Sequence, residues 1–158
     1  MMELNKIGIE VDVATEIAEK LNDLSANYHI YYQNLRGFHW NIKGKNFFAL
    51  HPKFEELYTQ AFEDIDKIAE RIRALGFIPK HAYSDYIRIS DIKELKDVTD
   101  ENTCIKDILQ NLSILIFKEK ELMKLTADGH DDGTNNMIND FIEDHEKQVW
   151  MLSAFLNQ

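Results

Sequence analysis

The sequence predicts an all-α protein built as a bundle of four long helices, with a shorter helix in the connection between the second and the third. Four segments of the 158-residue chain carry apolar residues at every third or fourth position, as one face of a helix does. No segment alternates apolar and polar residues for long enough to form a strand. Two prolines and six glycines punctuate the chain, and their positions mark the segments.

The first two helices are predicted on either side of a short turn. The first covers about residues 11–38 and ends before the turn sequence NIKGKN. The second covers about residues 47–75, and Gly76 followed by Pro79 marks its end. Pro52 falls in the first turns of this helix, where the missing N–H is tolerated best.

The last two helices follow a long connection, residues 76–100. We expect the third at about 101–127, capped by Thr99 or Asp100, and the fourth at about 134–156. The sequence SDIKELKDV inside the connection favours the short extra helix. A connection of this length allows the second and third helices to run parallel, as in a ferritin-like bundle. The alternative is an up-and-down bundle with a long loop.

The composition limits the kind of partner. With 18 basic and 28 acidic residues the formal charge is −10, which disfavours nucleic acid and anionic membranes and suits metal cations. The single cysteine, Cys104, excludes an internal disulfide and fits a reducing compartment. The sequence shows neither a signal peptide nor a membrane-spanning run. We therefore expect a soluble, cytoplasmic protein that does not bind membranes.

One face of the second helix collects potential metal ligands. At about 100° per residue, four such side chains fall within a face about 100° wide. They are His51, Glu55, Asp66 and Glu70. Tyr58 and Phe62 lie on the same stripe, which indicates a site walled by a packed interface.

Distance along the helix decides how these residues can act. His51 and Asp66 are separated by 15 residues, or about 22 Å, whereas a metal–ligand bond is about 2 Å. Two such helices packed antiparallel around a two-fold axis would place the His51 end of one against the Asp66 end of the other. We expect a site with His39 and His51 from one subunit and Asp66 and Glu70 from its partner, assisted by Glu55.

Two imidazoles with carboxylates suit Fe(II), Zn(II), Mn(II) or Co(II). On spacing alone the alternative is stronger: packed histidines beside a solvated acidic face. No Glu-x-x-His motif occurs in the sequence, and the closest approach, Glu143-Asp-His145, has the wrong step. A di-iron site inside one bundle, which uses that motif, is therefore not expected.

Several motifs together resemble the Dps-type miniferritins. They are NLRGFHWNIKG, the FF.LH..FEELY pattern, DIDKIAERI, RALGFIP, the D..T pattern near residues 131–134, and KQVWML. The resemblance covers nearly the whole chain in order. Its most specific part is the set His39, His51, Asp66 and Glu70 with the flanking Trp40, Asn41 and Gly44.

The resemblance implies a ferritin-like fold and a hollow homo-oligomer, a dodecamer with ferroxidase centres at its two-fold interfaces. It implies His39 and His51 as iron ligands from one chain, Asp66 and Glu70 from the other, and Glu55 as a further acidic ligand. One or two irons would occupy each site. The implied reaction is oxidation of Fe(II) to Fe(III), preferably by hydrogen peroxide, with storage of the ferric mineral. Trp40 would intercept stray oxidising equivalents or simply pack at the interface.

The acidic segment ADGHDDGTNNMIND resembles the lining of the iron-entry pores of this family. Asp128, Asp131, Asp132 and Asp140 are the candidates, and Asn136 departs from the family pattern. Binding of DNA is the alternative function, but the termini lack the basic extensions that neutralise phosphates, so we do not expect it. A third hypothesis is a purely structural shell without metal chemistry.

Overall fold

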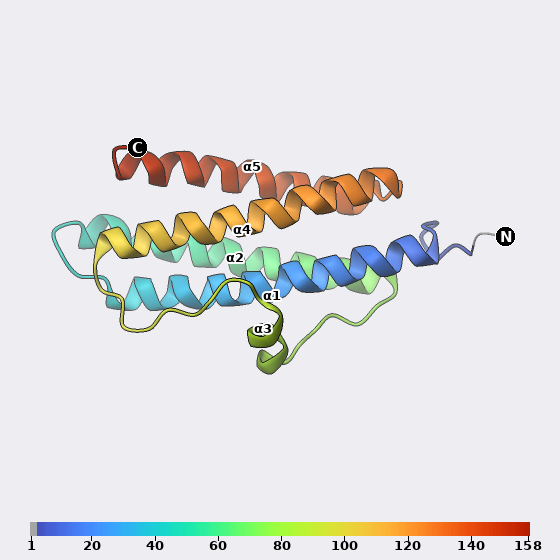
Figure 1. Cartoon of the computed structure of the whole chain (residues 1–158), viewed down its shortest axis with the longest axis horizontal. Helices are drawn as coiled ribbons and strands as arrows, with labels where there is room; N and C mark the ends of the chain where they lie inside the picture. The colour runs from blue at the N-terminus through green and yellow to red at the C-terminus, as the bar shows by residue number, and fades with distance from the viewer. Residues whose placement is uncertain (1–2) are drawn as a thin grey trace.

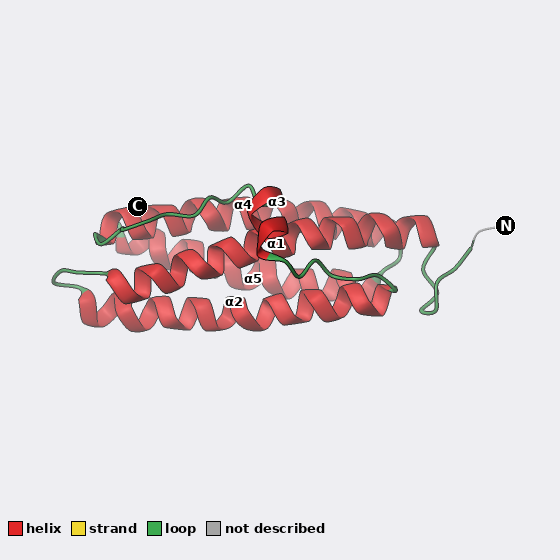
Figure 2. Ribbon diagram, turned by 90° about the horizontal axis from the view of Figure 1, so that it is seen from below, coloured by secondary structure: helices red, strands yellow, loops and turns green. Residues whose placement is uncertain are grey.

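The computed structural model describes residues 3–158 and contains four long helices and one short one. Their bounds are α1 Val11–Asn41, α2 Phe47–Leu75, α3 Tyr83–Ile89, α4 Glu101–Asp128 and α5 Asp132–Phe155. The four long helices lie side by side, and α3 packs outside them against α1 (Figure 1). All regular structure in the described part of the chain is helical (Figure 2), so the all-α prediction is confirmed.

The long connection sets the direction of the helices. In Figure 1 α2 and α4 run the same way, because the chain from the end of α2 returns along the whole bundle before α4 begins. This is the ferritin-like arrangement, and the up-and-down alternative is wrong. Within residues 3–158, no helix has the length and apolar character needed to cross a membrane.

The short helix lies earlier in the connection than predicted. It occupies Tyr83–Ile89, whereas SDIKELKDV, residues 90–98, is not helical. The reason is two buried asparagines of α1. Asn27 accepts hydrogen bonds from the backbone N–H groups of residues 91 and 92, and Asn34 pairs with the backbone of residues 93 and 95. These side chains satisfy backbone groups that a helix would otherwise have paired internally.

The helix ends follow local chemistry. Gly76 adopts the left-handed conformation, with φ 102°, at the end of α2, and Asp100 caps α4 by accepting the N–H of Thr103, as predicted. Helix α1 continues three residues beyond the predicted end because Gly37 is accommodated inside it. As a consequence His39 lies in the last turn of a helix, on a rigid element.

The core lies between the four long helices. Its largest fully buried side chains are contributed by α1, α2 and α4, among them Tyr28, Phe38, Phe54, Ile68 and Ile105. The buried polar side chains include Glu119 and His145, which face each other inside the bundle. The α1/α2 face, by contrast, leaves Phe62 61% exposed.

Candidate metal centre

The structure brings His39 and His51 into direct contact. His39 is in the last turn of α1 and His51 is near the start of α2, on either side of the short turn. Their rings stack with centroids 3.8 Å apart and planes 12° apart. The pair therefore sits at the end of the bundle where α1 passes into α2.

Each histidine is held by the backbone of the other. His39 Nδ1 lies 2.6 Å from the carbonyl oxygen of His51, and His51 Nδ1 lies 2.7 Å from the carbonyl oxygen of His39. A carbonyl oxygen can only accept a hydrogen bond, so Nδ1 carries the proton in both rings. In a neutral ring with the proton on Nδ1, the lone pair that can bind a metal is on Nε2. The reciprocal bonds thus fix both imidazoles in the tautomer that binds a metal through Nε2.

The three carboxylates of the predicted set are all exposed on α2. Glu55 lies one turn beyond His51, whereas Asp66 and Glu70 lie in the second half of the helix, about 22 Å or more from His51 along its axis. Within residues 3–158, no three His, Cys, Asp or Glu side chains gather closely enough to hold a metal ion. One chain therefore presents the predicted ligands as two separate groups on one face of α2.

Aromatic rings surround the histidine pair. Phe47 stacks on His51 with centroids 4.9 Å apart, and Tyr58 meets the His39 ring edge-on at 5.4 Å. Tyr32 of α1 continues the series, 6.0 Å from Tyr58. Tyr58 was predicted on this face of α2, whereas no role was predicted for Phe47 or Tyr32. Their place beside the histidines could have been predicted from the sequence, because each lies within one or two helical turns of a candidate histidine on the same helix.

Trp40 follows His39 directly but points into solvent. It is exposed, and the guanidinium of Arg36 lies 4.8 Å from its ring. Arg36 also lies 5.3 Å from the ring of Tyr32, so one cation bridges two aromatic side chains along α1.

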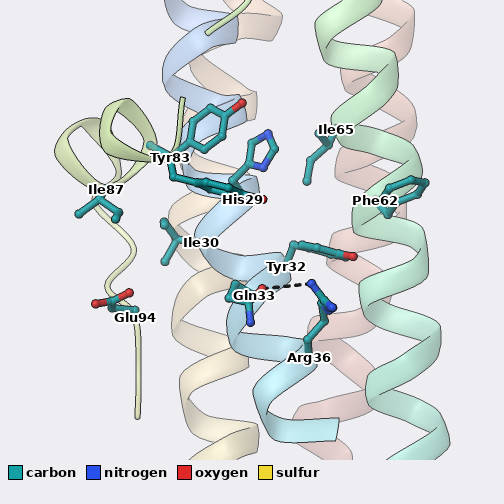
Figure 3. A pocket seen from close by; sticks show the side chains of 11 residues that line it. His29, Ile30, Tyr32, Gln33, Arg36, Phe62, Ile65, Tyr83, Ile87 and Glu94 are labelled. Carbon is teal, nitrogen blue, oxygen red and sulfur yellow. Dashed lines mark hydrogen bonds between the residues drawn. The ribbon is translucent and has the colours of Figure 1, made fainter. Parts of the chain in front are cut away.

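A groove of about 400 Å³ lies on the same side of the bundle, between α1, α2 and α3. Figure 3 shows Tyr32, Phe62, Ile65, Tyr83 and Ile87 around it, with Arg36 bonded to Gln33 at its lower edge. The lining is mainly apolar. On α2 the groove is lined by Phe62 and Ile65, which lie between His51 and Asp66 along the helix.

His29 lines the upper part of this groove. It stacks on Tyr86 of α3 with centroids 3.8 Å apart. Burial lowers the pKa of His29 to about 4. His29 is therefore neutral near pH 7 and acts as a flat packing surface between α1 and α3.

The prediction that Asp131 lines a pore is wrong. Asp131 is 1% exposed; it caps α5 through the N–H of Thr134 and forms an ion pair with Arg71 of α2 at 2.6 Å. Its carboxylate is occupied inside the protein and does not line an opening. Asp128 and Asp132 are exposed on either side of the turn between α4 and α5, and Asn136 and Asp140 are exposed further along α5.

Known proteins resemble this chain in sequence and in fold. A family model for the ferritin-like domain matches residues 18–158. The chain is 34% identical to the DNA protection during starvation protein of Porphyromonas gingivalis, over 96% of both chains. It is 44% identical to an uncharacterized protein of Haemophilus influenzae, over 97% of this chain and 96% of that one. The crystal structure of Dps from Vibrio cholerae O1 superposes with a TM-score of 0.96 at 41% identity, covering 99% of this chain and 98% of that one.

The chain belongs to the Dps family of ferritin-like proteins. Membership implies iron storage and protection during starvation as the general role. The Vibrio cholerae Dps is described as a member of the ferritin-like diiron-carboxylate superfamily, which supports iron binding and iron oxidation in general terms.

Proposed function

We propose that this chain is the subunit of a ferroxidase and iron store. It oxidises Fe(II), preferably with hydrogen peroxide, and retains ferric oxide-hydroxide in a hollow dodecameric shell in the cytoplasm. The observation that carries the proposal is the histidine pair, whose two Nε2 lone pairs are fixed by reciprocal backbone bonds. Histidines that only pack would not require Nε2 of both rings to be free to bind a metal.

The site is completed by a second copy of the chain. In an antiparallel pair of α2 helices, His51 lies opposite the partner's Asp66 and Glu70 when the two-fold axis passes near the middle of α2. Phe62 is close to that position and is 61% exposed in the single chain. The apolar groove beside it offers further area for burial. The contact that brings the ligands together is thus also the contact that covers exposed aromatic surface.

The stacking of the two imidazoles bears on the number of ions. A metal binds a histidine in the plane of the ring, at about 2 Å from nitrogen. With the two planes nearly parallel and the centroids 3.8 Å apart, one ion cannot lie in both planes. We therefore favour two ions per site, one on each histidine, over the single-ion alternative. Anaerobic titration with Co(II) should saturate near two ions per chain.

Two Fe(II) ions suit peroxide as the oxidant. Each gives up one electron, and the pair reduces one hydrogen peroxide and two protons to two waters. A single Fe(II) would transfer one electron and release a hydroxyl radical. The paired site therefore removes both reagents of that damaging reaction. The exposed Asp128, Asp132 and Asp140 are the proposed attraction points for incoming Fe(II).

The experiment compares His51→Ala with His81→Ala. His81 is an exposed histidine of the connection, bonded only to the nearby carbonyl of Pro79, so its removal controls for the loss of an imidazole. Fe(II) is added anaerobically, then peroxide, and ferric absorbance is followed. We expect a large loss of rate in His51→Ala and none in His81→Ala. Equal rates in all three proteins would refute the ferroxidase assignment.

DNA binding is the second function to consider, because relatives are named DNA protection during starvation proteins. The chain carries a formal charge of −10, which opposes contact with phosphates. We propose that this protein does not bind DNA directly. A gel shift with metal-free protein at low salt tests this, and a clear shift would overturn it.

A further inference from the structure

Three polar side chains meet in the middle of the bundle, away from the proposed metal centre. They are Tyr28 of α1, Glu119 of α4 and His145 of α5, and all three are buried. The Tyr28 hydroxyl donates to Glu119 Oε1 at 3.0 Å, and His145 Nδ1 lies 3.0 Å from Glu119 Oε1 and 3.2 Å from Oε2. The ring is closed by His145 Nε2, 3.5 Å from the Tyr28 hydroxyl.

The bonding pattern has room for a proton on each ring nitrogen of His145. The Tyr28 hydroxyl proton is committed to Glu119, so the hydroxyl oxygen can only accept from His145 Nε2. His145 Nδ1 in turn faces a carboxylate that can only accept. A doubly protonated His145 donates from Nδ1 to Glu119 and turns Nε2–H toward the Tyr28 oxygen, so the geometry accommodates an imidazolium beside the carboxylate.

The surroundings agree with this assignment. Burial alone lowers the pKa of His145, but the hydrogen bond to Glu119 and the negative charge of Glu119 outweigh it, so that the pKa is raised. Asp64 of α2 and Asp144 of α5 add to the negative charge around the ring, and Tyr31 of α1 is the other titratable neighbour. Each of the four long helices thus contributes a group that faces the cluster.

We propose that Glu119 and His145, joined by Tyr28, form a proton-dependent clasp that ties α1, α4 and α5 together inside the bundle. With the proton present, the buried carboxylate is neutralised by its partner. When the proton is lost, Glu119 remains as a buried charge without a counter-ion, which is strongly unfavourable. The bundle is then weakened from its core while its apolar packing is unchanged.

The clasp should stabilise the fold at low pH and weaken as pH rises. A histidine whose pKa is raised in the folded state stabilises the fold fully below its unfolded pKa of about 6.5 and ceases to do so as pH rises through the folded pKa. Deposition of ferric oxide-hydroxide releases protons, so mineralisation would hold the clasp closed. That last link rests on the proposed function, whereas the clasp itself does not.

The test measures guanidinium unfolding of iron-free protein between pH 6 and 9 at one protein concentration. The principal variant replaces both charged partners, Glu119→Leu with His145→Leu, because a buried ion pair exchanged for apolar residues usually leaves a foldable protein. Relative to this variant, the unfolding constant of wild type should rise with pH by up to tenfold per unit, about 1.4 kcal/mol, once pH exceeds about 6.5.

Two further variants make the result specific. His81→Gln removes an exposed histidine and should keep the wild-type pH profile. Tyr28→Phe removes only the bridging hydroxyl; a lower folded pKa of His145 should make the loss of stability above about pH 6.5 smaller and end it at lower pH. The clasp is overturned if the double variant keeps the wild-type profile or if His81→Gln abolishes it. An unchanged profile in Tyr28→Phe would remove Tyr28 from the clasp.

Discussion

Phe62→Ala tests the interface that completes the proposed metal centre. A phenylalanine offers about 200 Å² of surface, and 61% of Phe62 is exposed in the single chain, so about 120 Å² is available for burial. At about 25 cal/mol per Å², this corresponds to about 3 kcal/mol per chain. A two-fold interface uses the residue twice. Allowing for the carbon that alanine retains, the substitution should weaken the pair by about 5 kcal/mol, or a thousandfold or more in the dissociation constant.

The assay for Phe62→Ala is sedimentation velocity over a range of protein concentrations, paired with Co(II) titration. Alanine favours helix, so α2 itself should remain folded, which circular dichroism checks. We expect the variant to dissociate and to lose Co(II) binding over the same concentration range. Phe117→Ala is the matched control, since Phe117 is 66% exposed but lies on α4, and it should bind Co(II) as wild type does. Assembled Phe62→Ala with full Co(II) binding would refute the interface.

Three further predictions concern stability. Asn27→Ala leaves two backbone N–H groups of the connection without their acceptor. It should lower the free energy of unfolding, measured by guanidinium titration, by about 2–5 kcal/mol. A loss below about 1 kcal/mol would show that Asn27 does not hold the connection in place. Arg71→Ala leaves the Asp131 carboxylate buried without its counter-charge and should cost about 3–5 kcal/mol, so a variant as stable as wild type would show the pair to be unimportant. The pKa of His29 is lowered, so its neutral form, stacked on Tyr86, stabilises the fold. This stability is present above about pH 6.5 and is lost as pH falls toward about 4. His29→Phe should lose less thermal stability over that range than wild type, and an equal loss would refute the assignment.

The sequence predicted those features that depend on neighbouring residues. Helix periodicity placed the four long helices, and the chemistry of Gly76 and Asp100 marked two of their ends correctly. The approach of His39 to His51 was also expected, because only a short turn separates their helices. These are local relations, and no knowledge of the rest of the fold is needed to see them.

The errors arose where the deciding partner is distant in sequence. The short helix was placed too late because Asn27 of α1, more than 60 residues earlier, pairs with the backbone of the connection. Asp131 was taken for a pore residue because its partner, Arg71, belongs to another helix. The tautomers of the histidine pair follow from two carbonyl positions that only the folded backbone reveals.

In each proposed metal centre, one chain supplies the histidines and its partner supplies Asp66 and Glu70. A co-assembly experiment tests it directly. One variant lacks the histidine half, through His39→Ala and His51→Ala, and the other lacks the acidic half, through Asp66→Ala and Glu70→Ala. Each alone should be inactive in Fe(II) oxidation by peroxide.

When the two variants are unfolded together and refolded at equal amounts, half of the two-fold pairs should be mixed. Each mixed pair holds one intact site and one site that lacks both histidines, Asp66 and Glu70, because the site is shared across the axis. We expect the mixture to recover about a quarter of the wild-type rate. Mixtures that remain as inactive as the separate variants, despite confirmed co-assembly, would contradict a site shared between subunits.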